Sequence, residues 1–490
     1  MSLVHSMPQN GSQANSANQQ ALLLIIASIV SISPLILYVS PVKGNIVSLL
    51  SLGIMYLLVL RKSIGLLGFL LTATSVVTLY FLREIQYETG ISSAIIAQLL
   101  LACLLIYLIG CRLLLDKLRI IKKNIYGTLE KIRFGKLQFW LCFIVLFLAI
   151  LNSFYWTLPT FKILIYLITM LLLTSFVSDS SIMQFVKYSS KFHLIILYGG
   201  LLGFLYAIFG GDALFTILNE DGRQNGFYLS TFSNTYLNGF IRPSGIYDEP
   251  GALSFFVCLT VALRESYQLD RRCSWLLLAL SFITVSLAHF IFVIMFFIHV
   301  YRGRLVRAAW ILIIISFLLL AIITIIDNPL SMIIKEFANR LTIKDGMLVG
   351  NNRSALVINA INYMDFRVFF FGLDGNCIAN NELCDQSQYE QYGENPLTLL
   401  VHLGIFISLP YYVVLSALVY NSIKNINFVV FGVFLLLLQR PYVLSYGYVV
   451  IIIIYLLVIF KGTSKVSSPR RRESSLIKHL DSRFLGNDGK

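Results

Sequence analysis

Long apolar runs follow one another along most of this chain of 490 residues. A helix needs about 17 to 25 predominantly apolar residues to cross a bilayer, and several runs of about that length precede residue 210. They lie at 21–39, 45–60, 63–82, 92–111, 137–158, 160–178 and 192–209, of which 45–60 is marginal. The pattern predicts an all-α, polytopic integral membrane protein.

The pattern resumes at Pro250, where we expect a helix to begin because proline suits the first helical turn. The apolar run 274–300 then lies between two groups of arginines, and a single crossing would place these groups on opposite sides of the membrane. We therefore predict two short passes that turn near Thr284, Ser286 and His289, with His289 as a hydrogen-bonded structural residue. Further apolar runs lie at 308–326, 396–418, 427–441 and 445–460.

Composition and charge agree with a membrane protein. Hydrophobic residues make up 57% of the chain and charged residues 13%, and the mean hydropathy is +0.79. The formal net charge of +14 would also suit a nucleic-acid-binding protein. The basic residues, however, cluster beside apolar runs, where they orient helices in a bilayer. We therefore expect membrane lipid, and no nucleic acid, as a partner.

The charge distribution predicts the topology. Residues 112–136 carry eight basic side chains and two acidic ones, so we place this loop in the cytoplasm. Counting from it gives about 14 crossings with both termini in the cytoplasm and two large outer loops, 210–249 and 327–395. We expect a polar cytoplasmic N-terminus (1–20), one integral membrane domain (21–460) and a basic cytoplasmic tail (461–490).

The first outer loop ends in the sequence Arg-Pro-Ser-Gly-Ile-Tyr-Asp-Glu-Pro-Gly at 242–251. It places Arg242, Tyr247, Asp248 and Glu249 at the start of the helix expected at Pro250. An ionisable group near hydrocarbon needs a partner or a ligand, so these residues are candidates for a functional site. The alternative is that the two acids only cap the helix.

The second outer loop contains a matching candidate at Arg353. The two outer loops hold 14 of the 24 acidic residues, so an arginine there is in the minority. Asn351 or Asn352 would cap a helix, which places Arg353 in its first turn. Free N–H groups and an arginine form a phosphate site, although an exposed or ion-paired arginine fits the pattern equally well.

Three further features of the second loop bear on chemistry. Cys377 and Cys384 share it, and we predict that they form a disulfide in an oxidising compartment. Metal binding there is disfavoured because no histidine lies near them in the sequence. Glu394 and Asn395 precede Pro396, which repeats the carboxylate-before-proline pattern of Glu249 and Pro250.

The order of these motifs resembles the bacterial Wzy-type O-antigen and capsule polymerases, which are related to the O-antigen ligases. The matching elements are Arg-x-Ser-Gly-x-x-x-Glu-Pro-Gly at 242–251, Asn-Arg-Ser at 352–354, Phe-Gly-Leu-Asp-Gly at 371–375, and Glu394-Asn395 with Leu397 and Gly404. The resemblance covers roughly residues 200–440. It implies an inverting glycosyltransferase, without metal or cofactor, that joins undecaprenyl-diphosphate-linked repeat units at the periplasmic face of the inner membrane. A chain-length regulator protein is the implied partner.

On this resemblance, the candidate residues take specific roles. Arg242 and Arg353, with Asn352 and Asn395, would bind the diphosphate, because arginine carries a permanent charge and forks to two oxygens. Tyr247 would stack on or hydrogen-bond a sugar. A carboxylate would accept the proton of the attacking hydroxyl, with Glu249 preferred, then Glu394, then Asp248.

Other classes of protein remain as alternatives. A flippase or transporter would spread charges through its helices and often contain an internal repeat, whereas here the candidates gather in two outer loops. The ligases have a histidine where this chain has Glu394. A metal-dependent lipid-linked glycosyltransferase usually has paired acidic residues in its first outer loop, and residues 40–44 contain none.

Overall fold

The computed structural model describes parts of the chain from residue 179 onward. The described residues are 179–218, 224–234, 236–237, 240–247, 249–304, 343–344, 347–348, 353–362, 364–372, 395–440, 452, 455–456 and 459–460. The helices expected before residue 179, the run 308–326, most of the run 445–460 and the basic tail lie outside them. The predicted total of about 14 crossings therefore stays a prediction.

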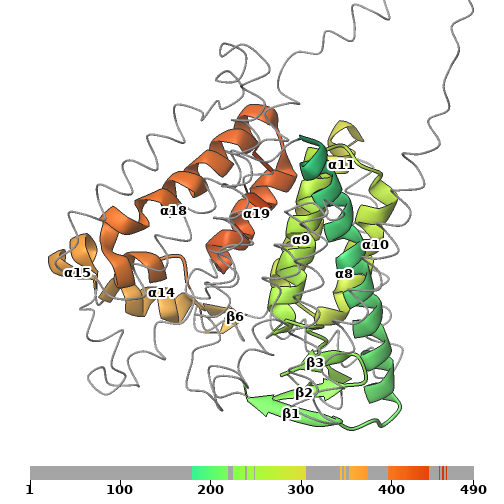
Figure 1. Ribbon diagram of the computed structural model, residues 1–490. Helices are drawn as coiled ribbons and strands as arrows, with labels where there is room; N and C mark the ends of the chain where they lie inside the picture. The colour runs from blue at the N-terminus through green and yellow to red at the C-terminus, as the bar shows by residue number, and fades with distance from the viewer. Residues whose placement is uncertain are drawn as a thin grey trace, which may run out of the picture.

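The described residues are mostly helical, with short antiparallel strands (Figure 1). The helices are α8 (Asp179–Ile208), α9 (Pro250–Ser266), α10 (Arg271–Ser281), α11 (Leu287–Tyr301), α14 (Arg353–Asn362), α15 (Phe366–Phe371), α18 (Thr398–Asn425) and α19 (Phe428–Gln439). Single 3-10 turns follow α10 at Phe282–Thr284 and α11 at Arg302–Arg304.

The expected outer loop 210–249 contains β-structure that the helical pattern did not predict. Strands β1 (Phe215–Leu218), β2 (Gln224–Tyr228) and β3 (Thr231–Ser233) form one antiparallel sheet in the order β1-β2-β3. Two pairs follow, β4 (Tyr236–Leu237) with β5 (Phe240–Ile241), and β6 (Ile343–Lys344) with β7 (Met347–Leu348). In Figure 1 the first sheet lies below the lower end of α9 and beside the lower part of α8.

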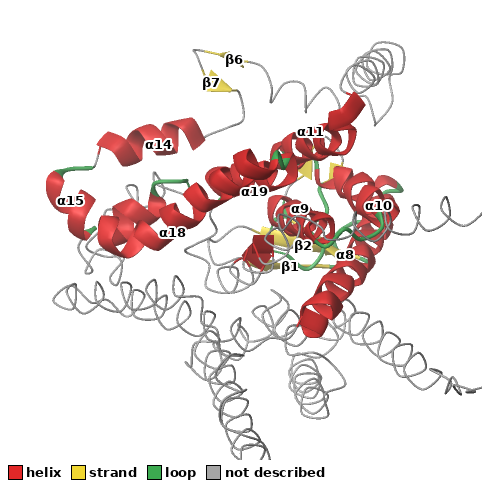
Figure 2. Ribbon diagram, turned by 90° about the horizontal axis from the view of Figure 1, so that it is seen from above, coloured by secondary structure: helices red, strands yellow, loops and turns green. Residues whose placement is uncertain are grey.

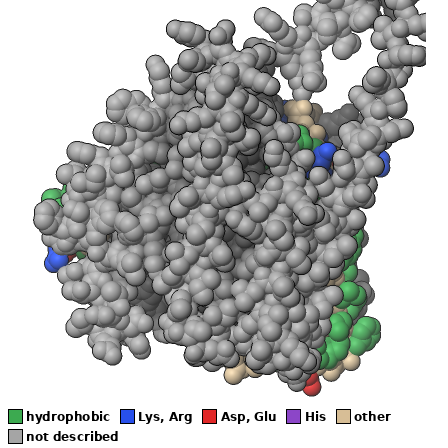
Figure 3. Space-filling model, viewed as in Figure 1, with side chains coloured by type: hydrophobic (Ala, Val, Ile, Leu, Met, Phe, Trp, Pro, Cys, Tyr) green, Lys and Arg blue, Asp and Glu red, His purple; other side chains and the backbone are tan. Residues whose placement is uncertain are grey.

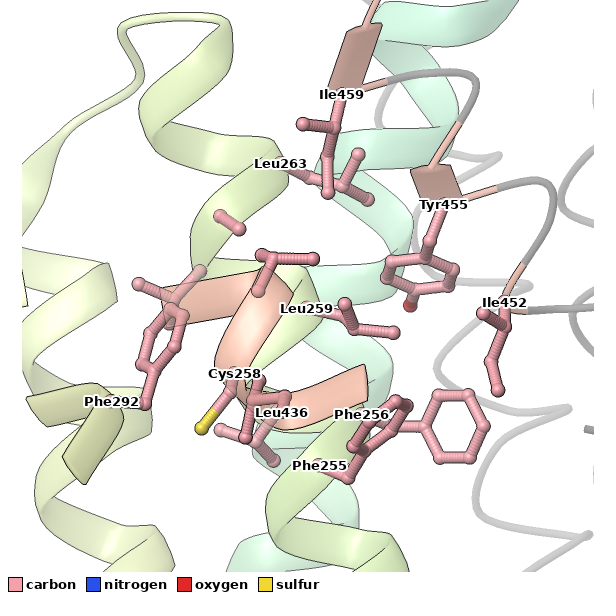
Figure 4. Packing of buried hydrophobic residues seen from close by; sticks show 14 of the residues in the cluster. Phe255, Phe256, Cys258, Leu259, Leu263, Phe292, Leu436, Ile452, Tyr455 and Ile459 are labelled. Atoms are coloured by element: carbon pink, nitrogen blue, oxygen red, sulfur yellow. The ribbon is translucent and has the colours of Figure 1, made fainter. Parts of the chain in front are cut away.

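Helix α9 lies at the centre of the helix bundle, against α8, α10, α11 and α19 (Figure 2). Its residues from Ala252 to Leu263 are all buried. A helix that is apolar on every side must be covered on every side. Figure 4 shows the resulting core, a cluster that includes Phe256 and Leu259 of α9 together with Phe292, Leu436 and Tyr455. The surrounding helices therefore fix the position of the first turn of α9.

Helices α10 and α11 form the predicted pair of short helices. The apolar run is interrupted at Phe282–Ser286, where Val285 has a left-handed backbone (φ 47°). Trp275, near the start of α10, packs on Phe296, near the end of α11, so the two helices are antiparallel. The predicted interruption is thus confirmed. The expectation for His289 is also confirmed, since this buried residue bonds to the carbonyl of Leu278 at 3.0 Å.

The described helices have two chemically different ends. At one end, Arg264 donates to Ser190 Oγ (2.9 Å), Arg271 pairs with Glu265, and Arg302 donates to the carbonyl of Ile426. The strands and the start of α9 lie at the opposite end (Figure 1). This separation matches the predicted placement of the arginines and of the loop 210–249. Which end faces the cytoplasm stays a prediction.

Among the described residues, one helical segment is long and apolar enough to cross a membrane, Val186–Ile208 of α8. Helices α11 and α19 are apolar but shorter. Exposed apolar side chains line the outer flank of α8, among them Tyr198, Leu202 and Leu205. In Figure 3, hydrophobic side chains accordingly show along the right-hand flank, where α8 runs in Figure 1.

Candidate functional site

The segment before α9 is held by backbone pairing with β3. Phe232 N donates to Gly245 O and Ser244 N donates to Phe232 O, both at 2.8 Å, and Gly245 N donates to Thr231 Oγ1. Gly245 has φ 63°, and a Cβ there would lie 2.3 Å from the side chain of Ile196. Only glycine fits this conformation and this contact. Ser244 and Gly245 of the sequence motif therefore have a structural role, which is to fix the residues on either side.

Arg242 reaches from this segment to the turn between α10 and α11. Its Nε donates to the carbonyl of Thr284 (2.9 Å) and its Nη2 to the carbonyl of Val285 (3.2 Å). The two carbonyls are neutral, so these bonds orient the guanidinium without adding an opposite charge. The sequence predicted an anion-binding role for Arg242. The structure adds that the same side chain holds the short helical hairpin.

Glu249 forms an ion pair with Arg440. Glu249 is the N-cap residue of α9, with extended backbone (φ −148°, ψ 156°), but its side chain accepts no capping bond. The carboxylate instead meets the guanidinium, and the side chains are 12% and 28% exposed, respectively. The helix-capping alternative for Glu249 is therefore wrong. The carboxylate has a charged partner from a distant part of the chain.

The chain geometry around Pro441 explains why Arg440 reaches this position. Helix α19 ends at Gln439, and Arg440 has extended backbone (φ −143°, ψ 98°). A residue before proline is disfavoured in the helical conformation. Gly251 leaves room beside the pair, since a Cβ there would lie 3.4 Å from both Arg440 Nη1 and Glu249 Oε1. The Glu-Pro-Gly motif thus places a carboxylate and a side-chain-free position together against Arg440.

The structure does not support Tyr247 as a sugar-binding surface. Tyr247 is 4% exposed, and its ring stacks on Phe256 with centroids 5.2 Å apart. Its hydroxyl lies 2.8 Å from His193 Nε2. Burial raises the pKa of this hydroxyl well above its ordinary value, with a smaller contribution from Tyr455. The tyrosine is an internal anchor, and the sequence could not show this because the partner lies on α8.

Tyr247 begins a chain of buried polar groups. His193 Nδ1 lies 2.8 Å from the carbonyl of Ser189 and 3.1 Å from Thr260 Oγ1, which in turn lies 3.1 Å from the hydroxyl of Tyr455. Buried polar groups are costly unless they are hydrogen-bonded, and these satisfy one another. The chain connects α8, α9 and Tyr455, so it fixes the register of α9 against its neighbours.

Asn395 also has a structural role in place of the expected ligand-binding one. It is fully buried, its Oδ1 accepts from Leu397 N (2.8 Å), and its own N donates to Thr398 Oγ1 (2.9 Å). These reciprocal bonds satisfy backbone groups where α18 begins. Asn395 therefore organises the start of a helix and is buried away from solvent.

Two other motif residues meet in space. A Cβ at Gly404, inside α18, would lie 2.3 Å from the carbonyl oxygen of Phe370 in α15. Gly404 has φ 68° and kinks α18. Gly372 (φ 83°) ends α15. The Phe371-Gly372 motif and Gly404 thus belong to one close crossing of two helices.

The structure describes only part of the remaining candidate site residues. Helix α14 begins at Arg353, which confirms the predicted helix start. Both views place α14 beside α18 and on the other side of α19 from α9 (Figures 1 and 2). The Arg353 side chain and residues Asp248, Asn352, Cys377, Cys384 and Glu394 lie outside the described parts. Convergence of Arg242 and Arg353 and the disulfide therefore stay predictions.

Sequence reasoning missed Arg440 and His193. A signal for Arg440 was present, because Gln439-Arg440-Pro441 places a charged residue at the end of the apolar run 427–441, on the side where the outer loops are expected. For His193 the sequence shows only a lone histidine in an apolar run. Within the described residues, no three His, Cys, Asp or Glu side chains gather as metal ligands do.

Comparisons of the sequence with protein-family models and with curated proteins give no match.

Proposed function

We propose that the protein is an inverting, metal-independent polymerase that joins lipid-diphosphate-linked oligosaccharide repeat units into O-antigen or capsule polysaccharide at the outer face of the bacterial inner membrane. The observation that carries the proposal is the meeting of Glu249 and Arg440 at the start of α9, a helix that is buried from Ala252 to Leu263. Arg242 lies in the segment just before that start. A carboxylate and arginines at one end of a helix bundle suit a reaction that removes a proton and releases an anion.

The reaction assigns a task to each group. The hydroxyl oxygen of an acceptor sugar attacks the anomeric carbon of the donor chain from the side opposite the diphosphate. The carbon–oxygen bond to the diphosphate breaks, and its electron pair stays on the leaving group. The hydroxyl proton passes to Glu249 and then to water. Arginines stabilise the departing diphosphate, because preorganised donors aimed at developing charge are usually the largest catalytic contribution.

The distribution of charge supports an enzyme over a transporter. At the end of the bundle where α9 begins, the ion pair joins the carboxylate of Glu249 to Arg440, the residue that follows α19. The arginines Arg264, Arg271 and Arg302 lie at the opposite end, each with a hydrogen-bond or ion-pair partner there. Charges concentrated at the two ends suit surface chemistry on a lipid-linked substrate better than a path through the bundle.

Deletion of the gene tests the function. Loss of polymerisation should leave surface glycan with a single repeat unit, and the wild-type gene, but not Glu249→Gln, should restore long chains. A ligase would instead leave the surface core without repeats while polymer remains on its lipid carrier. A flippase would leave lipid-linked units on the inner face. Either of these results would refute the polymerase proposal.

Purified protein with lipid-linked repeat units tests the chemistry. Polymer should form in EDTA, and Glu249→Gln should lower the rate by about 10²- to 10⁴-fold, the usual contribution of a general base. Full activity of Glu249→Gln with loss in Glu394→Gln would transfer the role to Glu394. Abolition by EDTA would refute the metal-independent mechanism.

A further inference from the structure

Arg440 is the more accessible member of its ion pair. Its side chain is 28% exposed, whereas that of Glu249 is 12% exposed. Arg440 extends from the end of α19 in non-helical backbone, while Glu249 is fixed at the first turn of α9. An anion that approaches this end of the bundle can therefore reach the guanidinium more readily than the carboxylate.

The ion pair conflicts with the role of Glu249 as a base. A neighbouring guanidinium favours the charged form of a carboxylate and so weakens its affinity for a proton. Arginine also binds diphosphate oxygens through the same bidentate fork that it offers to a carboxylate. In the proposed reaction Arg440 thus has two anionic partners, the carboxylate of Glu249 and the diphosphate. The diphosphate arrives only with the donor.

We propose that Arg440 exchanges partners during the reaction, so that the diphosphate of the donor draws the guanidinium away from Glu249 and releases the carboxylate to accept a proton. The proposal rests on the polymerase function. It makes Arg440 a ligand of the leaving group, and it orders the steps. Glu249 takes the acceptor proton only after a donor is bound, and Arg440 then stabilises the electron pair left on the diphosphate.

Binding of farnesyl diphosphate to the purified full-length protein in detergent tests the exchange. Glu249→Gln removes the competitor for Arg440, so binding should tighten by about fivefold, the order of magnitude of a partly exposed ion pair. Arg440→Gln should weaken binding. The double variant should bind less than about twofold more tightly than Arg440→Gln alone. This remaining difference is the part due to repulsion between Glu249 and the diphosphate.

The affinities of the wild type, the two single variants and the double variant together test the exchange of partners. Equal affinity of the wild type and Glu249→Gln would overturn the proposal. So would an effect of Glu249→Gln on affinity that is as large in the Arg440→Gln protein as in the wild type. If Arg440→Gln does not fold, Arg440→Lys serves, since it keeps the charge but loses the fork. Inorganic pyrophosphate is measured in parallel. Coupling with pyrophosphate and none with farnesyl diphosphate would overturn the assignment to a lipid-linked donor.

Failure of the exchange can be told from failure of the polymerase function. If gene deletion stops polymerisation but the binding measurements show no coupling, only the exchange is refuted. If coupling is measured while deletion leaves polymer chains intact, the diphosphate site stands and the polymerase function is refuted. Absence of farnesyl diphosphate binding to the wild type would refute the exchange outright.

Discussion

The hydroxyl of Tyr247 lies 2.8 Å from Nε2 of His193, and this bond ties the segment before α9 to the middle of α8. The ring centroids are 6.2 Å apart with planes 9° apart, as expected when two rings join end to end through a hydrogen bond. The position of Glu249, two residues further on, thus depends on a histidine in the interior of the bundle.

Removal of this hydroxyl should destabilise the protein. Tyr247→Phe keeps the ring but leaves a buried ring nitrogen of His193 without this partner, which costs about 1–3 kcal/mol. Tyr198→Phe is the matched control, because Tyr198 is 47% exposed on the same helix as His193. Thermal unfolding in detergent should separate the two variants. Equal stability of both would show that the Tyr247 hydroxyl is not an anchor.

Replacement of Arg242 by Lys should lower polymerisation while the protein still folds. Lysine cannot donate to both carbonyls in the geometry of the guanidinium. Loss of a hydrogen bond from a charged group corresponds to about tenfold or more in rate where it orients the reacting groups. The measurement is polymer formation by purified protein.

Arg302→Lys provides the control for Arg242→Lys. Arg302 also donates to a backbone carbonyl, that of Ile426 at 3.3 Å, but at the opposite end of the bundle. Arg302→Lys should keep its activity and lose less stability than Arg242→Lys, because Arg302 makes one exposed bond and Arg242 two partly buried ones. A parallel loss of activity in both lysine variants would mean that Arg242 acts only through stability.

Gly404→Ala should prevent normal folding. Its φ of 68° disfavours alanine, and the new methyl group would lie 2.3 Å from the backbone oxygen of Phe370. The backbone conformation alone costs about 1–2 kcal/mol, and the contact requires α15 to move. Gly303→Ala is the control, since among the described residues, its chain neighbours aside, no atom lies within 4 Å of the added Cβ. Yield and thermal unfolding should be normal for Gly303→Ala, and a normal Gly404→Ala protein would contradict the crossing.

Thiol labelling tests which end of the helix bundle faces the outside of the membrane. Gln224 lies in β2 and is exposed, whereas Cys273 lies at the start of α10, at the opposite end. An impermeant reagent should label Gln224→Cys in intact spheroplasts and leave Cys273 unlabelled until the membrane is permeabilised. Labelling of Cys273 from outside would contradict the predicted topology.

The pH dependence of Cys273 labelling provides a separate test. Partial burial raises the pKa of this thiol; Arg264 lowers it and Asp270 raises it, both by smaller amounts. Because the thiolate is the reactive form, Cys273 in permeabilised cells should reach half its maximal rate at a higher pH than Gln224→Cys. Asp270→Asn removes a negative charge but keeps a side chain that can cap α10, so it should move this midpoint to lower pH. An unchanged midpoint would exclude the influence of Asp270.

Local signals in the sequence were enough for some features and not for others. Pro250 marked the start of α9, and the polar residues near Thr284 marked the break between α10 and α11, because both depend on neighbouring residues alone. The strands near the start of α9 were missed because runs of two to five residues acquire their conformation from pairing. The Glu249–Arg440 pair was missed because it joins segments far apart in the chain.

The burial of α9 from Ala252 to Leu263 has a consequence for how the gene can change over time. Along α8, exposed Tyr198, Leu202 and Leu205 alternate with buried His193, Ile196 and Leu197. Substitutions should therefore be tolerated on α8 with the period of a helix. On α9, by contrast, no side of the helix is free to vary, so a library of random variants should show an uninterrupted block of intolerance from Ala252 to Leu263.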